Sequence, residues 1–478
     1  MRTEKDSLGT LRLPKAVYYG IHTQRAMDNF PITGEKCQPE MIRAFLEIKQ
    51  AAAKVNAAAG DLDPKIAKTI VQVTEQLLTS PLDFSMWPLD PIQGGAGTSL
   101  NMNVNEVLAN LANERLGGQL GKYQLVNPND HVNLGQSTND TYPSAGKLAL
   151  LRLLAPLKQS LTTLIDAMGN QADQNVRVYK MGRTQLQDAV PMTLGNSFHA
   201  WLKPLLRDLA RIEVSEQALH QLNLGGSAIG SGINVSYHYQ THIVPKLGEI
   251  TGLELSQAHD LFDATQNLDG LVALSGSLKG LAVNLSKIAN DLRLLSSGPR
   301  SGLNEINLPA RQAGSSIMPG KVNPVIPEVV NQVAFEVLGN DATISAASEA
   351  GQLELNAFEP VIFYRLFASI THLTGAMNTF CEHAIVGITP NKDRLAKDID
   401  LSASFATAMA KIIGYAPATK LAKQSLKTGQ PLREIAADSG LFSAEDLQHV
   451  FAVEEIVINA RTPEHGLVLR PLSETTTD

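Results

Sequence analysis

The feature that most constrains the fold of this chain is a set of long apolar stripes with alternating steps of three and four residues. The clearest stripe runs through Leu271, Leu274, Leu278, Leu281, Leu285, Ile288, Leu292 and Leu295. Four others follow the same spacing, over residues 150–168, 194–205, 326–337 and 358–377. Because this spacing gathers apolar side chains on one helix face, it predicts five long helices packed as a bundle.

The length of the chain, 478 residues, suggests about three domains. We predict an all-α fold with a mostly helical N-terminal domain over 1–139, a central five-helix bundle over 140–394 and a small helical domain over 395–478. Near residue 394 the charges become mixed and the predicted helices shorten. Stripes this long often bury one another between subunits, so an oligomer is expected.

Composition excludes several classes of protein. The net charge of −7 argues against nucleic acid or an anionic membrane as a general partner. Only two cysteines occur, Cys37 and Cys381, which excludes a disulfide framework and fits a reducing compartment. The N-terminus lacks the apolar stretch of a signal peptide, and no run of eighteen uncharged apolar residues appears. We therefore expect a soluble cytoplasmic protein.

The segment 314–324, with the sequence GSSIMPGKVNP, is the most informative polar stretch. Gly314 and Gly320 permit a loop that bends or swings, and two prolines within the segment prevent a continuous helix. Ser315 and Ser316 supply hydroxyls, while Lys321 and Asn323 supply a positive charge and an amide. An ordinary surface loop is the alternative, but three apolar residues between two apolar helices favour a loop that covers a ligand.

Three further polar clusters each lie next to a predicted helix. Thr98 follows a glycine turn, and the second cluster comprises Ser137, Thr138 and Asn139. Thr184 and Gln185 form the third. Hydroxyls at a helix start can bind a carboxylate together with the free backbone N–H groups, or can simply cap the helix.

Some neighbours of these clusters have structural interpretations. Asn101, Asn103 and Asn105 can be buried scaffold, and Arg183 with Asp188 is interpreted as a structural ion pair. Arg25, in the turn-rich N-terminal region, also fits an ion pair better than a ligand contact.

These segments resemble the fumarase/aspartase superfamily, and the resemblance extends over nearly the whole chain. Members of that superfamily eliminate a group from succinyl-type substrates to give fumarate. The resemblance implies a three-domain fold whose long helices, five per subunit, form a twenty-helix core in a homotetramer. It also implies active sites shared by three subunits and no required cofactor.

The resemblance further implies a role for each candidate residue. Ser315 would be the base that removes the β-proton. The residues that would hold the β-carboxylate and its enolate-like form are Ser316, Thr98, Ser137 and Thr138. Those that would bind the α-carboxylate are Lys321, Asn323 and Thr184. Those that would face the leaving group are Asn139 and Gln185. Glu328 matches an acidic position of the signature without a defined role, and the residue matching Arg25 lies near the active site in the family.

Gln185 separates two branches of the superfamily, because fumarases usually carry histidine at its position. Residues 182–188, 294–309 and 325–332 also resemble the aspartase branch, whose substrates would be L-aspartate, fumarate and ammonia. Fumarate hydratase is the alternative, and an inactive scaffold is disfavoured by the intact Ser315, Lys321 and Asn323. Residues 401–418 follow the family pattern less closely, which leaves activation by a divalent cation such as Mg²⁺ open.

Other chemistries find little support in the sequence. His238 and His242 are four residues apart, but neither a zincin glutamate nor a third ligand accompanies them, so no metal site is predicted. The glycine-rich stretch 223–234 lacks the strand–loop–helix setting of a phosphate-binding loop. A serine hydrolase would need a nucleophile elbow after a strand, where this chain is predicted to be helical.

Overall fold

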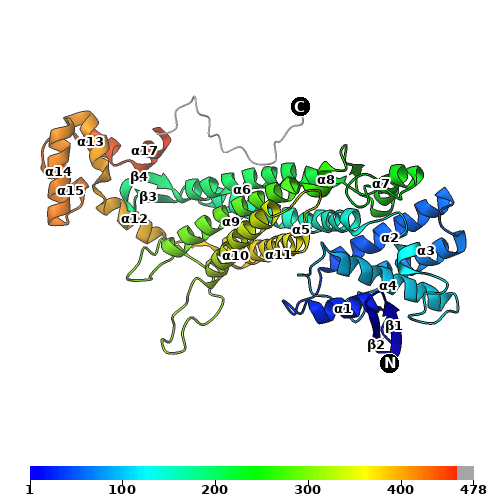
Figure 1. Cartoon of the computed structure of the whole chain (residues 1–478). Helices are drawn as coiled ribbons and strands as arrows, with labels where there is room; N and C mark the ends of the chain where they lie inside the picture. Colours follow the sequence, from blue (N-terminus) through cyan, green and yellow to red (C-terminus); the bar gives the residue numbers. More distant parts are fainter. Residues whose placement is uncertain (460–478) are drawn as a thin grey trace. The chain divides into compact units, whose positions relative to one another are not determined.

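A computed structural model of the chain describes residues 1–459 (Figure 1). The chain is predominantly helical over this range, which confirms the predicted all-α fold. The long helices are α2 (Pro39–Ala59), α4 (Thr98–Arg115), α5 (Thr138–Gln174), α6 (Leu194–Glu216), α9 (Asp269–Leu295), α10 (Val325–Glu349) and α11 (Glu359–His383). The shorter ones are α1 (Ile21–Asn29), α3 (Pro64–Thr79), α7 (Tyr237–Thr251), α8 (Asp263–Gln266), α12 (Lys392–Leu401), α13 (Ala406–Ile413), α14 (Tyr415–Thr428), α15 (Leu432–Asp438), α16 (Ala444–Val450) and α17 (Val453–Asn459).

The strands of the described residues form four two-stranded sheets. The antiparallel pairs are β1 (Arg2–Asp6) with β2 (Gly9–Leu13), β3 (Tyr179–Thr184) with β4 (Gln187–Thr193), and β7 (Ile306–Asn307) with β8 (Thr389–Pro390). The parallel pair is β5 (Gln221–Leu222) with β6 (Ser256–Gln257). The β3–β4 pair is a hairpin in the segment of the predicted polar cluster Thr184 and Gln185, where no strand was predicted from the sequence.

Two compact units make up the chain. The first comprises residues 1–162, 207–286 and 330–377, and the second comprises 163–206, 287–329 and the part of the chain from 378 onward. Each of the five long bundle helices contributes residues to both units. The division into three domains stays a prediction, and its last part includes residues 460–478, which lie outside the described range.

Aromatic contacts and buried hydrogen bonds join the long helices within the first unit. Tyr142 of α5 meets Phe363 of α11 at a ring-centroid distance of 5.9 Å. Hydrogen bonds between buried polar side chains accompany this apolar packing, such as Ser275 Oγ to Asp341 Oδ1 at 2.7 Å between α9 and α10. These polar pairs fix how the helices are rotated against each other, because a misplaced helix would leave buried groups unpaired.

The second unit contains a separate core formed by the C-terminal helices. Phe405, Met409, Leu432 and Ile435 pack together there, and Met181 of strand β3 belongs to the same cluster. The C-terminal helices therefore support the β3–β4 hairpin from one side.

Burial agrees with most of the predicted stripe positions and corrects three, of which Ile326, near the start of α10, is only partly buried. All eight residues of the stripe in α9 are buried. Phe358, however, is 45% exposed, because α11 begins only at Glu359. On α10 the buried face passes through Val330, Ala334 and Val337, and Val333 lies at its edge.

Helix α5 has the length and composition of a membrane-spanning helix, with an 18-residue window of mean hydropathy 1.3. Within that window 56% of the residues are buried inside the protein, as expected for the core helix of a bundle. Length and composition alone therefore give little support for a membrane span in the described part of the chain.

Candidate active site

Thr98 stands at the first position of α4, directly after a tight turn. Gly95, Ala96 and Gly97 all have positive φ angles, of 82°, 51° and 87°. A Cβ atom on Gly97 would lie 2.0 Å from the Tyr142 ring, so only glycine lets this turn pack against α5. Thr98 has no capping role here, and it lines a cavity of about 830 Å³ in the first unit together with Arg25.

Ser137, Thr138 and Asn139 form the start of α5. The Ser137 hydroxyl accepts the backbone N–H of Asn139 at 3.2 Å, and the Thr138 hydroxyl accepts Asn101 Nδ2 at 3.0 Å. Asn139 donates through Nδ2 to Ala228 O at 2.7 Å, which leaves its Oδ1 as an acceptor. Both hydroxyls therefore act as acceptors in these bonds and keep a hydrogen to donate.

Pro143 removes one backbone donor from this first stretch of α5. The carbonyl of Asn139, four residues earlier, accepts Asn223 Nδ2 at 2.9 Å in its place. A side chain from the glycine-rich stretch thus completes the helix start, which gives that stretch a structural function.

Asp140 holds the same segment in place through buried hydrogen bonds. Its carboxylate is fully buried and accepts the backbone N–H groups of Ser137, Gly225 and Ser227 at 3.0, 3.1 and 3.0 Å. Burial raises the pKa of Asp140 to about 7, and the three hydrogen bonds oppose that rise. We did not single out Asp140 from the sequence, where it resembles any acidic residue of a helix start.

Lys49 of α2 is the second important residue that sequence reasoning missed. It is 0% exposed, and its Nζ donates to Asn101 Oδ1, Asn133 Oδ1 and Gln136 Oε1 at 2.7, 3.0 and 2.8 Å. Burial lowers the pKa of Lys49 to about 7, against an opposing effect of the Asp140 charge. The sequence feature that could have identified Lys49 is its position on the apolar face of α2, one turn after Phe45.

Asn101, Asn103 and Asn105 are all buried on α4, which confirms their interpretation as scaffold. Asn101 and Asn105 both donate to Asn133 Oδ1, at 3.2 and 3.1 Å. Asn101 and Asn105 thus tie the Thr98 helix to the segment that precedes Ser137, whereas Asn103 donates to Met86 O at 3.0 Å.

Arg25 forms the ion pair that its position suggested. Its Nε and Nη2 donate to the two carboxylate oxygens of Asp6 at 2.7 and 2.9 Å, and this lowers the pKa of Asp6.

Buried Glu106 fixes the start of α1 by accepting the backbone N–H groups of Gly20, His22 and Thr23. Burial raises the pKa of Glu106 to about 7.

Thr184 and Gln185 lie at the tip of the β3–β4 hairpin in the second unit. Thr184 pairs with Gln187, so the loop consists of Gln185 and Leu186, with φ angles of 54° and 66°. Two positive φ angles are typical of a type I′ turn, although neither residue is the usual glycine or asparagine. Both side chains are exposed, and such a strained backbone is often found at functional sites.

The expected ion pair between Arg183 and Asp188 is not formed. Arg183 instead pairs with buried Glu305, which also contacts Lys180 Nζ at 2.7 Å. Asp188 accepts a hydrogen bond from Ser402 at 2.9 Å. The physical reason is that Glu305 is buried. An unpaired buried carboxylate costs more free energy than an unpaired charge on the half-exposed hairpin, so Arg183 pairs with Glu305.

Ser315 lies on the exposed loop that leads to α10. Its Oγ accepts two backbone N–H groups, from Ile317 at 3.2 Å and Met318 at 3.0 Å. Two N–H donors aimed at one hydroxyl oxygen favour its deprotonated form, because they stabilise negative charge there. The two bonds are compatible with the predicted role of Ser315 as a base.

The base of this loop is closed by two hydrogen bonds. Gly314 N donates to Lys321 O at 2.8 Å, and Asn323 Nδ2 donates to Gly314 O at 2.7 Å. Asn323 therefore anchors the loop with one amide hydrogen and keeps the other. Lys321 and Ser316 are exposed, and Glu328 lies in the first turn of α10.

The predicted site residues thus fall into two groups, each described within its own unit. The first unit holds Thr98, Ser137, Thr138, Asn139 and Arg25. The second unit holds Thr184, Gln185, Ser315, Ser316, Lys321, Asn323 and Glu328. Asn101 links Thr138 to the helix of Thr98 in the first group, and Glu305 links the hairpin to the segment before the Ser315 loop in the second.

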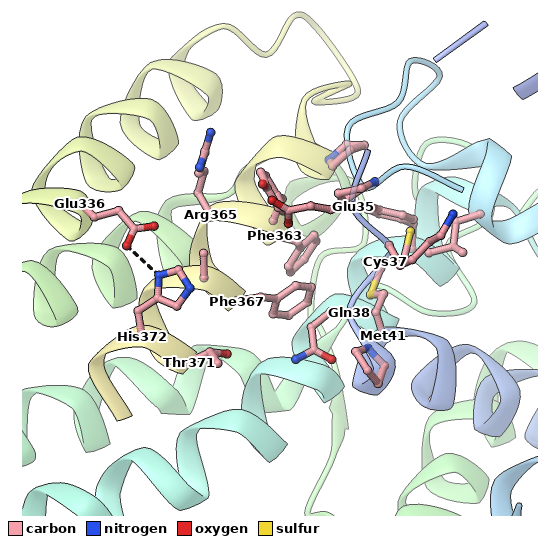
Figure 2. A pocket seen from close by; sticks show the side chains of 18 residues that line it. Glu35, Cys37, Gln38, Met41, Glu336, Phe363, Arg365, Phe367, Thr371 and His372 are labelled. Atoms are coloured by element: carbon pink, nitrogen blue, oxygen red, sulfur yellow. Dashed lines mark hydrogen bonds and ion pairs between the residues drawn. The ribbon is translucent and has the colours of Figure 1, made fainter. Parts of the chain in front are cut away.

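Another cavity of the first unit, of about 360 Å³, is lined by residues of the segment 35–41, α10 and α11, and by none of the predicted site residues (Figure 2). His372 and Glu336 pair at its edge at 2.7 Å.

Within residues 1–459 no group of three or more His, Cys, Asp or Glu side chains could hold a metal ion. His238 and His242 stack on each other at 4.1 Å.

Comparison with known sequences gives two family matches. The family described as Lyase matches residues 9–339, and the family described as Fumarase C C-terminus matches residues 405–457. The second match includes most of the stretch 401–418, which was expected to follow the family pattern less closely. Aspartate ammonia-lyase of Bacillus sp is 45% identical over 94% of this chain and 96% of its own length. The enzyme of that name from Escherichia coli K12 is 45% identical over 96% of each chain.

Solved structures agree in fold. A fumarate lyase:delta crystallin from Brucella melitensis, bound to cobalt, matches with a TM-score of 0.92 at 45% identity, covering 95% of this chain and 99% of the other. A class II fumarase from Schistosoma mansoni matches with the same TM-score at 33% identity, covering 96% and 100%.

Proposed function

This chain belongs to the aspartate ammonia-lyase branch of the fumarase/aspartase superfamily, and from that premise we propose that it interconverts L-aspartate with fumarate and ammonia. The observation that carries the proposal is 45% identity to aspartate ammonia-lyases over nearly the whole of both chains. The class II fumarase of similar fold is less similar in sequence, at 33%. Gln185, in place of the histidine usual in fumarases, supports the same choice.

The reaction removes a proton from the carbon next to the β-carboxylate. Negative charge then accumulates on that carboxylate as an enolate-like dianion. Collapse of the dianion forms the carbon–carbon double bond, breaks the C–N bond and releases ammonia. The site therefore needs a base, together with donors aimed at the carboxylate that gains charge.

Ser315 is the base in this proposal. The N–H groups of Ile317 and Met318 support it, because both point at Oγ and stabilise the alkoxide. After proton transfer the serine is again a neutral hydroxyl, and a proton must leave it before the next turnover. Lys321, on the same loop, adds positive charge that favours the alkoxide.

Donors for the β-carboxylate come from Thr98, Ser137, Thr138 and Ser316. The start of α5 suits an anion, since Ser137 and Thr138 accept hydrogen bonds from the protein and keep a hydrogen to donate outward. Helix N-termini also carry a partial positive charge. Lys321, Asn323 and Thr184 bind the α-carboxylate.

Asn139 and Gln185 face the amine that leaves. The free Oδ1 of Asn139 can accept a hydrogen bond from an ammonium group, as can the amide oxygen of exposed Gln185. Both side chains are neutral, so neither takes a proton from the amine at neutral pH. Glu328 and Arg25 have supporting positions, and Arg25 already has Asp6 as its partner.

We place the complete site in a homotetramer in which three subunits contribute to each site. Apolar side chains exposed on the single chain support an assembly: Val329, Phe335 and Leu338 on α10 are 38%, 63% and 39% exposed. Ile317 on the Ser315 loop is 83% exposed. We also propose a cytoplasmic location, which agrees with two buried free thiols, Cys37 and Cys381.

Two experiments test these proposals. Purified protein should form fumarate from L-aspartate and not from L-malate, measured by the absorbance of fumarate; turnover of malate alone would reject the ammonia-lyase. Mixing inactive Ser315→Ala and Thr98→Val proteins under conditions of subunit exchange should restore part of the activity. No restoration with exchange confirmed by mass would contradict shared sites.

A further inference from the structure

The buried lysine of α2 is the least expected feature of the first unit. Lys49 carries an amine in a position that is 0% exposed, yet no carboxylate lies within ion-pair distance among the described residues. Its three partners are side-chain amide oxygens, on Asn101, Asn133 and Gln136. An ammonium group has three hydrogens and no acceptor, so these three bonds use its whole capacity.

This arrangement fixes which way each amide points. An amide can turn by 180° and exchange its oxygen for its nitrogen, but only the oxygen can accept a bond from Lys49. Asn101 must therefore direct Oδ1 toward Lys49, at 2.7 Å, and Nδ2 toward Thr138 Oγ1, at 3.0 Å. Asn133 Oδ1 also accepts from Asn101 Nδ2, at 3.2 Å, and Lys49 bonds to that same oxygen, so the lysine acts on both ends of the amide that makes Asn101 a donor toward Thr138.

The orientation of Asn101 in turn determines the direction of the Thr138 hydroxyl. A hydroxyl that accepts a bond from Asn101 keeps its single hydrogen for another acceptor. If the Asn101 amide were reversed, its oxygen would accept that hydrogen and the hydroxyl would no longer be a donor toward the outside. A substrate carboxylate can only accept hydrogen bonds, so it needs the first arrangement.

We propose that Lys49 is a positioning residue for the substrate: it orients Asn101, and through Asn101 it makes the Thr138 hydroxyl a donor to the β-carboxylate. This inference rests on the proposed function, since it assumes that Thr138 binds the carboxylate. Lys49 does not touch the substrate. Its effect reaches the site through two hydrogen bonds.

A double-mutant cycle between Lys49→Met and Thr138→Val tests the proposal. Methionine keeps the length of the side chain and removes its donors, and valine keeps the shape of threonine without the hydroxyl. We expect each single variant to lower kcat/KM by about 100-fold, mainly through kcat, because the hydroxyl matters most as charge builds up. The double variant should lose no more than about threefold beyond Thr138→Val alone, because both changes remove the same interaction. Independent effects that multiply would overturn the proposal.

Asn101→Asp provides a second measurement that does not depend on the folding of Lys49→Met. A carboxylate still accepts the Lys49 bond, so the protein should fold, at a lower melting temperature than the wild type because the bond from Asn101 Nδ2 to Asn133 Oδ1 is lost. It cannot donate to Thr138, however, so kcat/KM should fall by about 100-fold, as for Lys49→Met. Should Lys49→Met not fold, Asn101→Asp takes its place in the cycle. Wild-type kcat/KM in a folded Asn101→Asp protein would overturn the proposal.

Lys54→Met is the matched control, since Lys54 is a half-exposed lysine on the same helix; it should change neither activity nor stability. The cycle is measured with whichever diacid the wild type converts. A wild type that converts malate and not aspartate contradicts the proposed function while the cycle still tests Lys49. A wild type inactive on both diacids would overturn both proposals.

Discussion

The two groups of site residues differ in how firmly the protein holds them. In the first unit, the turn at Gly97 and the start of α5 are fixed by buried side chains, among them Lys49 and Asp140. In the second unit, the Ser315 loop is mostly exposed and is closed at its base by two hydrogen bonds to Gly314. A rigidly held group of site residues and a loosely held group suit different tasks.

The difference teaches how binding and chemistry are divided. Donors that recognise a carboxylate gain from being preorganised, because no ordering is needed when the ligand arrives. A base that must approach the substrate, and then let the product leave, gains from a loop that can move. The predictions below test this division, beginning with the largest effect.

Ser315→Ala removes the proposed base. We expect kcat to fall by about 10³- to 10⁴-fold, measured as fumarate formation from aspartate. The melting temperature should not change, because the hydroxyl accepts bonds only from two exposed backbone groups of its own loop. Ser316→Ala, the neighbouring change, should cost only about tenfold as a lost binding contact. Equal effects of the two changes would contradict the assignment of Ser315 as the base.

Glu305→Gln tests the part of the second unit that is rigid. The change leaves buried Lys180 and half-buried Arg183 without their carboxylate, so it should destabilise the protein by about 3 kcal/mol. Urea unfolding of this unit, monitored by hydrogen exchange, measures the loss in the free energy of unfolding. Glu249→Gln breaks an exposed pair with Lys246 and should have no measurable effect. An undisturbed Glu305→Gln protein would show that the hairpin does not depend on this network.

Gly97→Ala and Gly320→Ala form a matched pair across the two regions. Both glycines have positive φ, 87° and 80°. A Cβ on Gly97 would collide with Tyr142, whereas a Cβ on Gly320 meets no atom within 4 Å. We expect a loss of about 3 kcal/mol for the first, from overpacking and backbone strain together, and about 1 kcal/mol for the second, measured by thermal unfolding. Similar losses would mean that the loop is as tightly packed as the turn.

Arg25→Gln should have the smallest effect. Arg25 lowers the pKa of Asp6, so the pair contributes stability above the unfolded pKa of that carboxyl, and the contribution is lost as the pH falls through the lower, folded pKa. The variant should melt about 1 °C below the wild type at pH 7, and the difference should vanish in strong acid. A difference that persists there would have to come from something other than the ion pair.

The helices could be predicted from the sequence because their period is strong and local. The stripe of α9 was found residue by residue, and the hydroxyls at the starts of α4 and α5 were found because capping residues and anion-binding residues are the same types. The end of a stripe is less certain: Phe358 continues the spacing, but the chain enters α11 only after it.

Other features depend on contacts that no local pattern encodes. The β3–β4 hairpin has Gln185 and Leu186 in its turn, without the Asn-Gly or Asp-Gly signal that identifies such loops. Lys49 lies between Ile48 and Gln50, and its three partners are 52, 84 and 87 residues away. Arg183 pairs with Glu305 across 122 residues, so the nearer Asp188 was the wrong choice.

The bonds inside the Ser315 loop provide a way to watch the base itself. The amide hydrogens of Ile317 and Met318 have Ser315 Oγ as their acceptor, so their chemical shifts report the electron density on that oxygen. Formation of the alkoxide should move both resonances downfield together, while the Gly314 amide, bonded to Lys321 O, stays in place. Selective ¹⁵N labelling of those two residues would thus allow the ionisation of the Ser315 side chain to be measured from two backbone amide resonances.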